Sequence, residues 1–331
     1  MIKFIGMKKI GLMTSGGDAP GMNACIRSIT KYCLNEGIEP IGFHDGFQGI
    51  IENNYKALTF EDVNNIVQRG GTILGTYRCE KFKSKEGRQK AITNIKSIGL
   101  NALICIGGDG TFTGASILSE EMNIPVVGIP GTIDNDIFGT DHTIGYDTAL
   151  NTVTEAVDKI RDTAGSHNRI FFVEVMGRNA GFIALNSAIA SGAESVLIPE
   201  EHTDAKLLAK DLKEQNKGRR SSIVIVAEGD DGGGAKKIMG QLKPLMHGYS
   251  LRYSILGHIQ RGGRPSAFDR ILATRMGAFA VELLLNGESN IMIGSNGDRL
   301  VHHPITDAMK IIAKPDLTKL DMLTNLRTLN P

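Results

Sequence analysis

The sequence contains no tryptophan and few cysteines, and the four cysteines form no CxxC pair: Cys25, Cys33, Cys79 and Cys105. Closely paired cysteines are typical of zinc sites and redox motifs, so we expect reduced thiols in a cytoplasmic protein. No apolar run reaches the ~18 residues that a membrane-spanning helix requires. The opening stretch MIKFIGMKK lacks the apolar segment of a signal peptide. Membrane insertion and secretion are therefore not expected.

An excess of charge of one sign is also absent. Lysine and arginine total 37, aspartate and glutamate total 36, and the formal net charge is +1. A balanced protein has no overall attraction to nucleic acid or to membrane surfaces, so neither is expected as a partner. A site for an anionic substrate must instead collect its positive charge locally. The length of 331 residues exceeds what one core usually covers and predicts two domains.

Two common nucleotide-binding signatures are missing as well. No GxxxxGK[ST] occurs, and no GxGxxG follows the first predicted strand, which argues against the P-loop and dinucleotide-binding folds. The sequence has instead 40 glycines, and short apolar runs that alternate with amphipathic stretches. This alternation predicts parallel βαβ units.

The predicted elements fall into two cycles. The first has strands within 8–14, 39–46, 101–110 and 124–136 and helices within 22–37, 91–100 and 111–122. The second has a helix at 148–164 and strands at 169–177, 195–200 and 221–229, with a loop expected at 231–237. We therefore predict an α/β protein of two three-layer α/β domains with mainly parallel sheets. In such sheets ligands gather beyond the carboxyl ends of strands, where the informative clusters of this sequence lie.

The stretch GGDGT, Gly107 to Thr111, follows the apolar strand ALICI and opens a helix. Backbone N–H groups at a helix N-terminus attract phosphate oxygens, and glycine lets the backbone approach them closely. Asp109 would repel phosphate unless a cation lay between them. Mg²⁺ held by a carboxylate and by phosphate oxygens fulfils that condition. The same residues also fit a plain strand–helix turn in which the aspartate caps the helix.

The stretch PGTIDND, Pro130 to Asp136, places two carboxylates, Asp134 and Asp136, directly after a strand. Phosphorylating an alcohol needs one group that accepts the hydroxyl proton and another that helps to hold the metal. Asp134 is the candidate base, and Asp136 is the candidate metal ligand. Asp-Asn-Asp taken alone is also an ordinary turn sequence.

Several arginines lie near predicted strand ends: Arg78, Arg169, Arg178, Arg252 and Arg261. The planar guanidinium suits phosphate oxygens, and a triphosphate donor with a phosphorylated acceptor needs several such groups. His258, which precedes Arg261 in GHIQRGG, is a further candidate donor. Taken singly, each arginine also fits a solvated surface charge, and the histidine also fits a packed core residue.

TSGGDAPGMN, RGGT-LGT-R, IGGDGT, PGTIDNDI, VEVMGR and LGHIQRGG with D-RILATRMG occur in this order. Together they resemble the bacterial ATP-dependent 6-phosphofructokinases, from about Lys8 to His303. The resemblance implies a glycolytic kinase that uses Mg²⁺ to transfer the γ-phosphate of ATP to the 1-hydroxyl of fructose 6-phosphate. It also implies an ATP-binding domain of residues 1–145 plus about 259–308, and a fructose 6-phosphate-binding domain of 146–258 plus about 309–331.

The resemblance assigns roles position by position. The nucleotide positions are Gly17, Arg78, Cys79, Gly108, Asp109, Gly110 and Thr111, with Asp109 and Asp136 placed toward Mg²⁺. The substrate positions are Thr132, Ile133, Asp134, Arg169, Met176, Gly177, Arg178, Glu228, Arg252, His258, Ile259, Gln260 and Arg261. Asp134 is the implied base, and Arg78 and Arg178 are the implied stabilisers of the transferring phosphoryl group. Cys79 replaces an aromatic residue common in the family, which loosens a nucleotide contact.

The resemblance further implies a homotetramer, a dimer of dimers in which Arg169 and Arg252 complete a neighbour's 6-phosphate site. An effector site for ADP or phosphoenolpyruvate would use Arg27, Lys31, Arg161, Gly192, Ala193, Glu194, Lys217, Arg219, Arg220 and Ser221. Lys31 departs from the usual arginine, and Phe60, Glu61 and Asn65 stand where Arg, Tyr and Asp are usual. Losing an arginine fork and gaining a carboxylate weakens phosphate binding, so weak regulation is predicted.

Three alternatives share parts of this pattern. Pyrophosphate-dependent relatives carry GGDD, whereas this chain has Gly110 at the last position and Gly131 where they have lysine. A non-catalytic sugar-phosphate sensor should have lost the base or the metal carboxylate, but Asp134 and Asp109 are both present. Lipid and NAD kinases share GGDGT, but they have no counterparts of the residues that the resemblance assigns to the sugar phosphate. These departures favour the ATP-dependent kinase.

Overall fold

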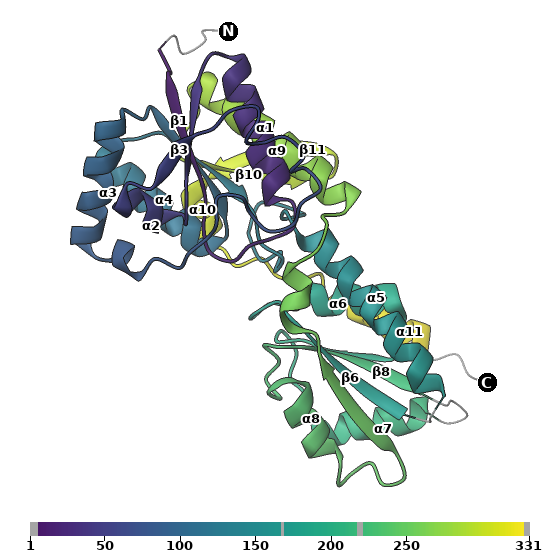
Figure 1. Ribbon diagram of the computed structural model, residues 1–331. Coiled ribbons are helices and arrows are strands. Elements are labelled where there is room, and N and C mark those ends of the chain that lie inside the picture. Colours follow the sequence, from purple (N-terminus) through teal and green to yellow (C-terminus); the bar gives the residue numbers. More distant parts are fainter. Residues whose placement is uncertain (1–5, 167–168, 217–220, 328–331) are drawn as a thin grey trace. The chain divides into compact units, whose positions relative to one another are not determined.

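The computed structural model describes residues 6–166, 169–216 and 221–327, and these residues divide into two compact units (Figure 1). Unit 1 takes the described chain up to Ile133, then Ile137–Thr148 and Arg261–Ala313. Unit 2 takes Asp134–Asp136, the described part of Ala149–Gln260, and the described chain from Lys314 onward. Each unit is built on its own sheet, so each has its own core.

Unit 1 contains a mainly parallel sheet whose strands, among the described residues, run in the order β11-β10-β5-β4-β1-β2-β3. The strands are β1 (Lys9–Thr14), β2 (Glu39–Phe43), β3 (Tyr55–Ala57), β4 (Ala102–Gly107), β5 (Val126–Pro130), β10 (Ile291–Asn296) and β11 (Arg299–Pro304). Only the outer pairs, β2 with β3 and β10 with β11, are antiparallel in this described sheet. β4 and β5 are buried along their whole length, which explains why they appear in the sequence as continuous apolar runs.

Helices cover both faces of this sheet, which gives unit 1 three layers (Figure 1). One face carries α1 (Met22–Asn35) and α9 (Ala267–Leu285), which pack against each other. The other face carries α2 (Phe47–Glu52), α3 (Lys85–Ile98), α4 (Asp109–Met122) and α10 (Ile305–Lys310), with the short 3-10 helix η1 (Glu80–Lys83) beside them. Phe43, Phe112 and Ile95 belong to the apolar core on this second face.

Unit 2 has a smaller sheet, and its described strands are all parallel in the order β7-β8-β6-β9. They are β6 (Arg169–Val175), β7 (Ser195–Leu197), β8 (Ser222–Ala227) and β9 (Ser250–Ile255), and η2 (Gly257–Arg261) follows β9. One face carries α5 (Tyr146–Gly165), α6 (Phe182–Ser191) and α11 (Thr318–Arg327), and the other carries α7 (Ala205–Gln215) and α8 (Gly234–Leu242) (Figure 1). The predicted fold of two three-layer α/β domains with mainly parallel sheets is confirmed.

The loop expected at 231–237 is wrong in its second half, because α8 begins at Gly234. Gly233 and Gly234 adopt left-handed φ angles of 89° and 80°, which turn the chain into the helix. The carboxylate of Glu174 on β6 accepts a hydrogen bond from the Ala235 N–H at 2.8 Å and so stabilises the helix N-terminus. Consecutive glycines have poor helix propensity, and the stabilising carboxylate comes from a distant strand, so the sequence hides this helix.

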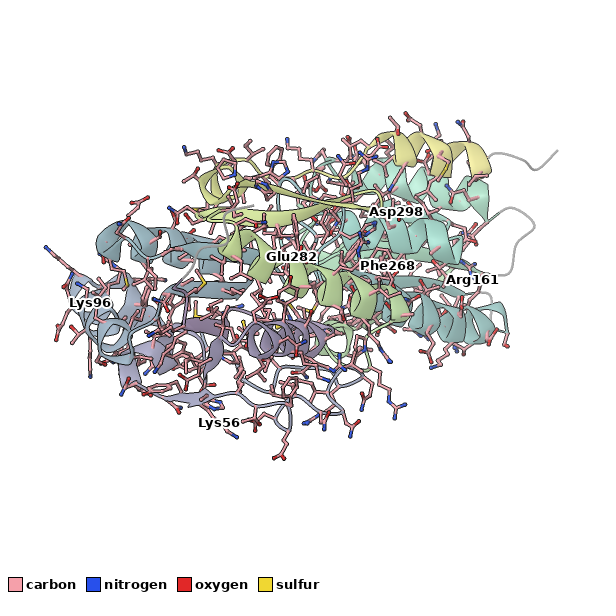
Figure 2. All side chains as sticks on the ribbon, turned by 90° about the horizontal axis from the view of Figure 1, so that it is seen from above. Lys56, Lys96, Arg161, Phe268, Glu282 and Asp298 are labelled. Atoms are coloured by element: carbon pink, nitrogen blue, oxygen red, sulfur yellow. The ribbon has the colours of Figure 1, made fainter. Side chains whose placement is uncertain are left out.

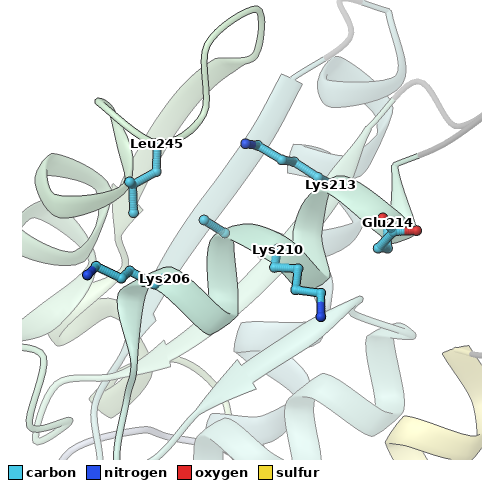
Figure 3. Close-up of a pocket in the computed structure, with 6 residues that line it drawn as sticks. Lys206, Lys210, Lys213, Glu214 and Leu245 are labelled. Carbon is cyan, nitrogen blue, oxygen red and sulfur yellow. The ribbon is translucent and has the colours of Figure 1, made fainter.

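The hollow in Figure 3 is a groove on unit 2 with a volume of about 210 Å³. Six residues line it, four of them exposed charged residues of α7 and two of them apolar: Lys206, Lys210, Lys213, Glu214, Ala209 and Leu245. These lining residues include no predicted site position. Separately, none of the described helices combines the length and hydropathy needed to cross a bilayer.

Candidate active site

The turn between β4 and α4 presents backbone without covering side chains. β4 ends at Gly107, Gly108 precedes the helix in an extended conformation, and Asp109 is exposed in the first helical turn. Among the described residues, no heavy atom lies within 4 Å of a Cβ added at Gly110. A Cβ added at Gly108 would have only Thr132 Cβ within that distance, at 3.9 Å. Helix N-terminal amides beside open space suit phosphate oxygens. The predicted position of GGDGT at a helix N-terminus is confirmed.

The glycine-rich loop at 14–21 is fastened to this turn and to the segment at 72–76. Thr111 Oγ1 donates a hydrogen bond to the Ser15 carbonyl at 3.1 Å. Thr76 Oγ1 donates to the Gly16 carbonyl at 2.8 Å. A Cβ at Gly107 would lie 2.5 Å from the Ser15 carbonyl oxygen, so only glycine fits there. Segments far apart in the sequence therefore form one continuous backbone surface in unit 1.

Three further predicted ligand residues of unit 1 have different surroundings. Arg78 is exposed, so its guanidinium is open to an anionic ligand. Cys79 Sγ donates to Gln48 Oε1 at 3.0 Å, and the side chain packs on the core, so the thiol contacts α2. Arg261 Nη1 donates to the Asp18 carbonyl at 3.2 Å and crosses Gly17, where a Cβ would collide with the guanidinium. Within this unit Arg261 supports the glycine-rich loop.

Asp109 fits a magnesium ion whose remaining ligands come from phosphate and water. Within 6–166, 169–216 and 221–327, no group of three or more His, Cys, Asp or Glu side chains is arranged to hold a metal. Mg²⁺ usually binds one or two carboxylates together with substrate phosphates, so a single exposed carboxylate at a helix N-terminus that suits phosphate would fit such an ion. Asp136, the second predicted ligand, is half-buried and belongs to unit 2.

Unit 2 pairs the predicted base with an arginine. The Asp134 side chain is buried, and its Oδ2 lies 3.4 Å from Arg178 Nε. The Arg178 side chain is 50% exposed, so the guanidinium joins the buried carboxylate to the surface. The sequence predicted both residues, and the structure brings them together. A carboxylate beside a cation that reaches solvent can accept a proton and also contact an anionic group.

Glu228 holds the turn that carries Arg178. Its Oε1 accepts hydrogen bonds from the Gly177 N–H at 3.2 Å and from the Arg178 N–H at 2.8 Å. Arg178 has a left-handed φ of 53°, which is strained for a residue with a side chain. A Cβ at Gly229 would collide with the Arg178 carbonyl, so this glycine permits the close approach. The resemblance assigned Glu228 to the sugar, and its position as a backbone anchor was not predicted.

Gln260 supports the same turn from the other side. It is fully buried, and its Oε1 accepts from the Met176 N–H at 3.1 Å while its Nε2 donates to the Gly257 carbonyl at 3.0 Å. Gln260 therefore ties η2 to the residue that follows β6. The neighbouring positions His258 and Ile259 are exposed on η2.

Arg169 lies at the opposite end of this sheet, and Arg252 lies near the middle of its strand. Arg169 opens β6, and Arg252 on β9 pairs with Phe171, whereas Met176 follows the carboxyl end of β6. At about 3.3 Å per strand residue, Arg169 and Met176 are separated by roughly 20 Å. Within one chain, the backbone of Arg169 therefore lies far from the turn that carries Arg178.

The predicted effector positions show two local arrangements. In unit 2, Arg161 contacts the buried Glu194 at 3.2 Å and donates to the carbonyls of Ser191 and Gly192. Glu194 Oε2 in turn accepts from the Ile223 N–H at 2.7 Å. In unit 1, Lys31 Nζ lies 5.9 Å from the centre of the Phe60 ring. Lys217, Arg219 and Arg220 lie outside the described residues.

Each set of residues, taken in its own unit, is compatible with a phosphotransferase of the α/β class. Unit 1 offers helix N-terminal amides and a metal-compatible carboxylate, and unit 2 offers a buried carboxylate beside an arginine. Phosphoryl transfer uses functional groups of these kinds. The chain belongs to the phosphofructokinase family, because the sequence profile described as Phosphofructokinase matches residues 9–284. This match confirms the resemblance found in the sequence.

Individual relatives agree with this assignment. The chain is 52% identical over 305 residues to ATP-dependent 6-phosphofructokinase 2 of Bacteroides thetaiotaomicron, covering 92% of this chain and 94% of that protein. It is equally identical, with the same coverage, to ATP-dependent 6-phosphofructokinase 1 of Thermus thermophilus. The structure is similar to phosphofructokinase from Saccharomyces cerevisiae, with a TM-score of 0.86 and 35% identity. That match covers 96% of this chain and 47% of the longer yeast chain.

Proposed function

We propose that this protein transfers the γ-phosphate of ATP to the 1-hydroxyl of fructose 6-phosphate in glycolysis, giving fructose 1,6-bisphosphate and ADP. The observation that carries the proposal is the pairing of buried Asp134 with half-exposed Arg178, on a turn held by Glu228. Relatives about 50% identical over most of their length are named ATP-dependent 6-phosphofructokinases. The reaction takes place in the cytoplasm.

In this reaction Asp134 accepts the proton of the 1-hydroxyl, and Arg178 and Arg78 balance charge on the transferring phosphoryl oxygens. Little covalent chemistry is required of the protein, because phosphoryl transfer depends mainly on positioning and charge neutralisation. Asp109 would hold Mg²⁺, which when bound neutralises phosphate charge. The glycine-rich loop and the β4–α4 turn in unit 1 bind ATP, and unit 2 binds the sugar phosphate.

A coupled assay with fructose 6-phosphate tests the phosphate donor. We expect turnover with ATP and none with pyrophosphate. The space beside Gly110 is open, so a Gly110→Asp variant folds but places a carboxylate where phosphate binds. Like-charge repulsion is expected to raise the KM for ATP at least tenfold, an energy of about 1.4 kcal/mol or more.

Gly110→Ala is the matched control, because it adds a Cβ without a charge. We expect its KM for ATP to stay close to that of the unaltered protein. Equal ATP affinity in Gly110→Asp would show that this position does not face the nucleotide. Turnover with pyrophosphate in the unaltered protein would contradict the proposed donor.

Regulation is expected to be weak. Arg161 already contacts Glu194 and two carbonyls, and Lys31 lies over Phe60 in place of an arginine fork. We expect ADP and phosphoenolpyruvate to change the half-saturating concentration of fructose 6-phosphate only modestly. Titration of both effectors at subsaturating fructose 6-phosphate measures this. A shift of ~50-fold or more, over ~2 kcal/mol of coupling, would contradict it, and Phe60→Arg should strengthen the response.

A further inference from the structure

Asp269 is a fully buried carboxylate at the start of α9 that the reaction steps above do not use. Its Oδ1 accepts a hydrogen bond from the Gly145 N–H at 2.9 Å. Its Oδ2 accepts from the Thr148 N–H at 2.8 Å and from Thr148 Oγ1 at 2.5 Å. Phe268, labelled in Figure 2, marks the end of α9 where this carboxylate lies. Asp269 therefore fixes both ends of the short segment at 145–148.

The two residues that precede this segment hold the turn that leads to the base. The Ile144 N–H donates to the Pro130 carbonyl at 2.9 Å, and Ile144 forms a parallel bridge with Gly131. Thr143 Oγ1 donates to the Thr132 carbonyl at 2.5 Å. Ile133 and Asp134 follow directly in the chain. Residues 143–148 thus form a brace between Asp269 and the turn at 130–132.

The brace at 143–148 also supports the glycine-rich loop. A Cβ at Gly21 would lie 2.7 Å from Ile144 Cγ2, and a Cβ at Gly145 would lie 2.7 Å from Ala19 Cβ. Both glycines have left-handed φ angles, 111° and 102°. The two backbones can approach this closely only because neither residue has a side chain. A displacement of the brace would therefore move both the loop and the turn.

We propose that Asp269 is a positioning residue for phosphoryl transfer, which acts through the brace at 143–148 on the turn before Asp134 and on the glycine-rich loop. This inference rests on the proposed function. The Asp269 carboxylate contacts neither the turn at 130–132 nor the glycine-rich loop, so its effect passes through Gly145 and Thr148. A displacement of about 1 Å in a positioned group can lower the rate by ~10²-fold.

The surroundings of Asp269 give the brace a pH dependence. The pKa of this carboxyl is raised to about 6, mainly by burial, while the Thr148 and Gly145 hydrogen bonds oppose the rise and nearby Asp147 adds to it. Asp147 accepts from Ser266 Oγ, and the His142 ring lies edge-on to Phe268 at 4.9 Å. On α9 itself, Arg270 Nε donates to the Pro265 carbonyl.

The ionised carboxylate is the form that accepts all these donors, since protonation places a hydrogen on one oxygen and removes an acceptor. As the pH falls through about 6, the brace is therefore expected to loosen and kcat to fall.

Asp269→Asn tests the proposal because it keeps the shape and replaces one acceptor oxygen by an NH₂ group. We expect kcat to fall by ~10²-fold, with the KM for ATP changed by less than about threefold. The decline of kcat near pH 6 should be absent in the variant. Hydrogen exchange at 130–134 and 143–148 should be faster, which reports on the brace independently of activity.

Ser119→Ala is the matched control. Ser119 is buried near the end of α4 and donates to the Ile124 carbonyl, so its loss destabilises unit 1 without touching the brace. If Asp269→Asn matches Ser119→Ala in kcat, pH profile and exchange, Asp269 is merely structural and the proposal fails. If Asp269→Asn does not fold, Thr148→Val decides by the same measurements, because it removes the hydroxyl that donates to Asp269 and accepts from the Ser266 N–H but leaves the carboxylate in place. If the unaltered protein is inactive, the proposed function fails instead. Hydrogen exchange in Asp269→Asn still tests whether Asp269 holds the brace.

Discussion

Replacing Asp134 by serine is expected to lower kcat by ~10²-fold or more, with much smaller changes in the KM for fructose 6-phosphate and ATP. The serine keeps a hydrogen-bonding group but cannot take the proton of the 1-hydroxyl. Asp134 is buried and paired with Arg178 at 3.4 Å, so the substitution also leaves the guanidinium without this carboxylate. Steady-state kinetics with saturating substrates measure the effect.

Asp204→Ser is a suitable control for this variant. Asp204 caps α7 by accepting hydrogen bonds from the Lys206 and Leu207 N–H groups, and serine is also a favourable residue at that position. The same chemical change should therefore leave kcat unaltered. Near-normal turnover in Asp134→Ser, with a folded protein, would show that Asp134 is not the base.

The local parts of the site follow from the sequence because they depend on short-range rules. GGDGT was predicted at a helix N-terminus since an apolar strand precedes it and an amphipathic stretch follows, and α4 begins at Asp109. PGTIDND was predicted after a strand, and β5 ends at Pro130. These motifs carry their own glycines and aspartates, so their place at the strand ends can be predicted from the sequence, whereas the distant segments that hold them cannot.

The supporting residues could not be predicted because their roles arise from tertiary contacts. Glu228 anchors a turn that follows another strand. Asp269 accepts hydrogen bonds from the segment at 145–148, which lies more than a hundred positions earlier in the chain. A buried carboxylate has no periodic or compositional signal, and it is stable only because donors from another segment surround it. The sequence feature that marks Asp269 is its place in the motif D-RILATRMG.

Arg252→Ala is expected to raise the half-saturating concentration of fructose 6-phosphate by ~30- to 150-fold, because a charge-assisted hydrogen bond to phosphate contributes about 2–3 kcal/mol. Arg169 opens β6 and Arg252 lies midway along β9, whereas Arg178 follows the carboxyl end of β6. We therefore propose a homotetramer, built as a dimer of dimers, in which these arginines complete a neighbour's site. In this arrangement, removing Arg252 from one subunit weakens the neighbour's site and leaves the subunit's own site intact.

Mixed oligomers test this sharing directly. When Arg252→Ala subunits pair with Asp134→Ser subunits, one of the two sites in each pair combines an intact Asp134 with an intact Arg252. Random mixing gives mixed pairs in half of the dimers, so activity at low fructose 6-phosphate should recover to about a quarter of the unaltered level. Mixing Arg252→Ala with the Asp134→Ser/Arg252→Ala double variant forms no intact site and serves as the control. If verified mixed oligomers stay as inactive as this control, each chain must build its site alone, and the positions of Arg169 and Arg252 on β6 and β9 would need another explanation.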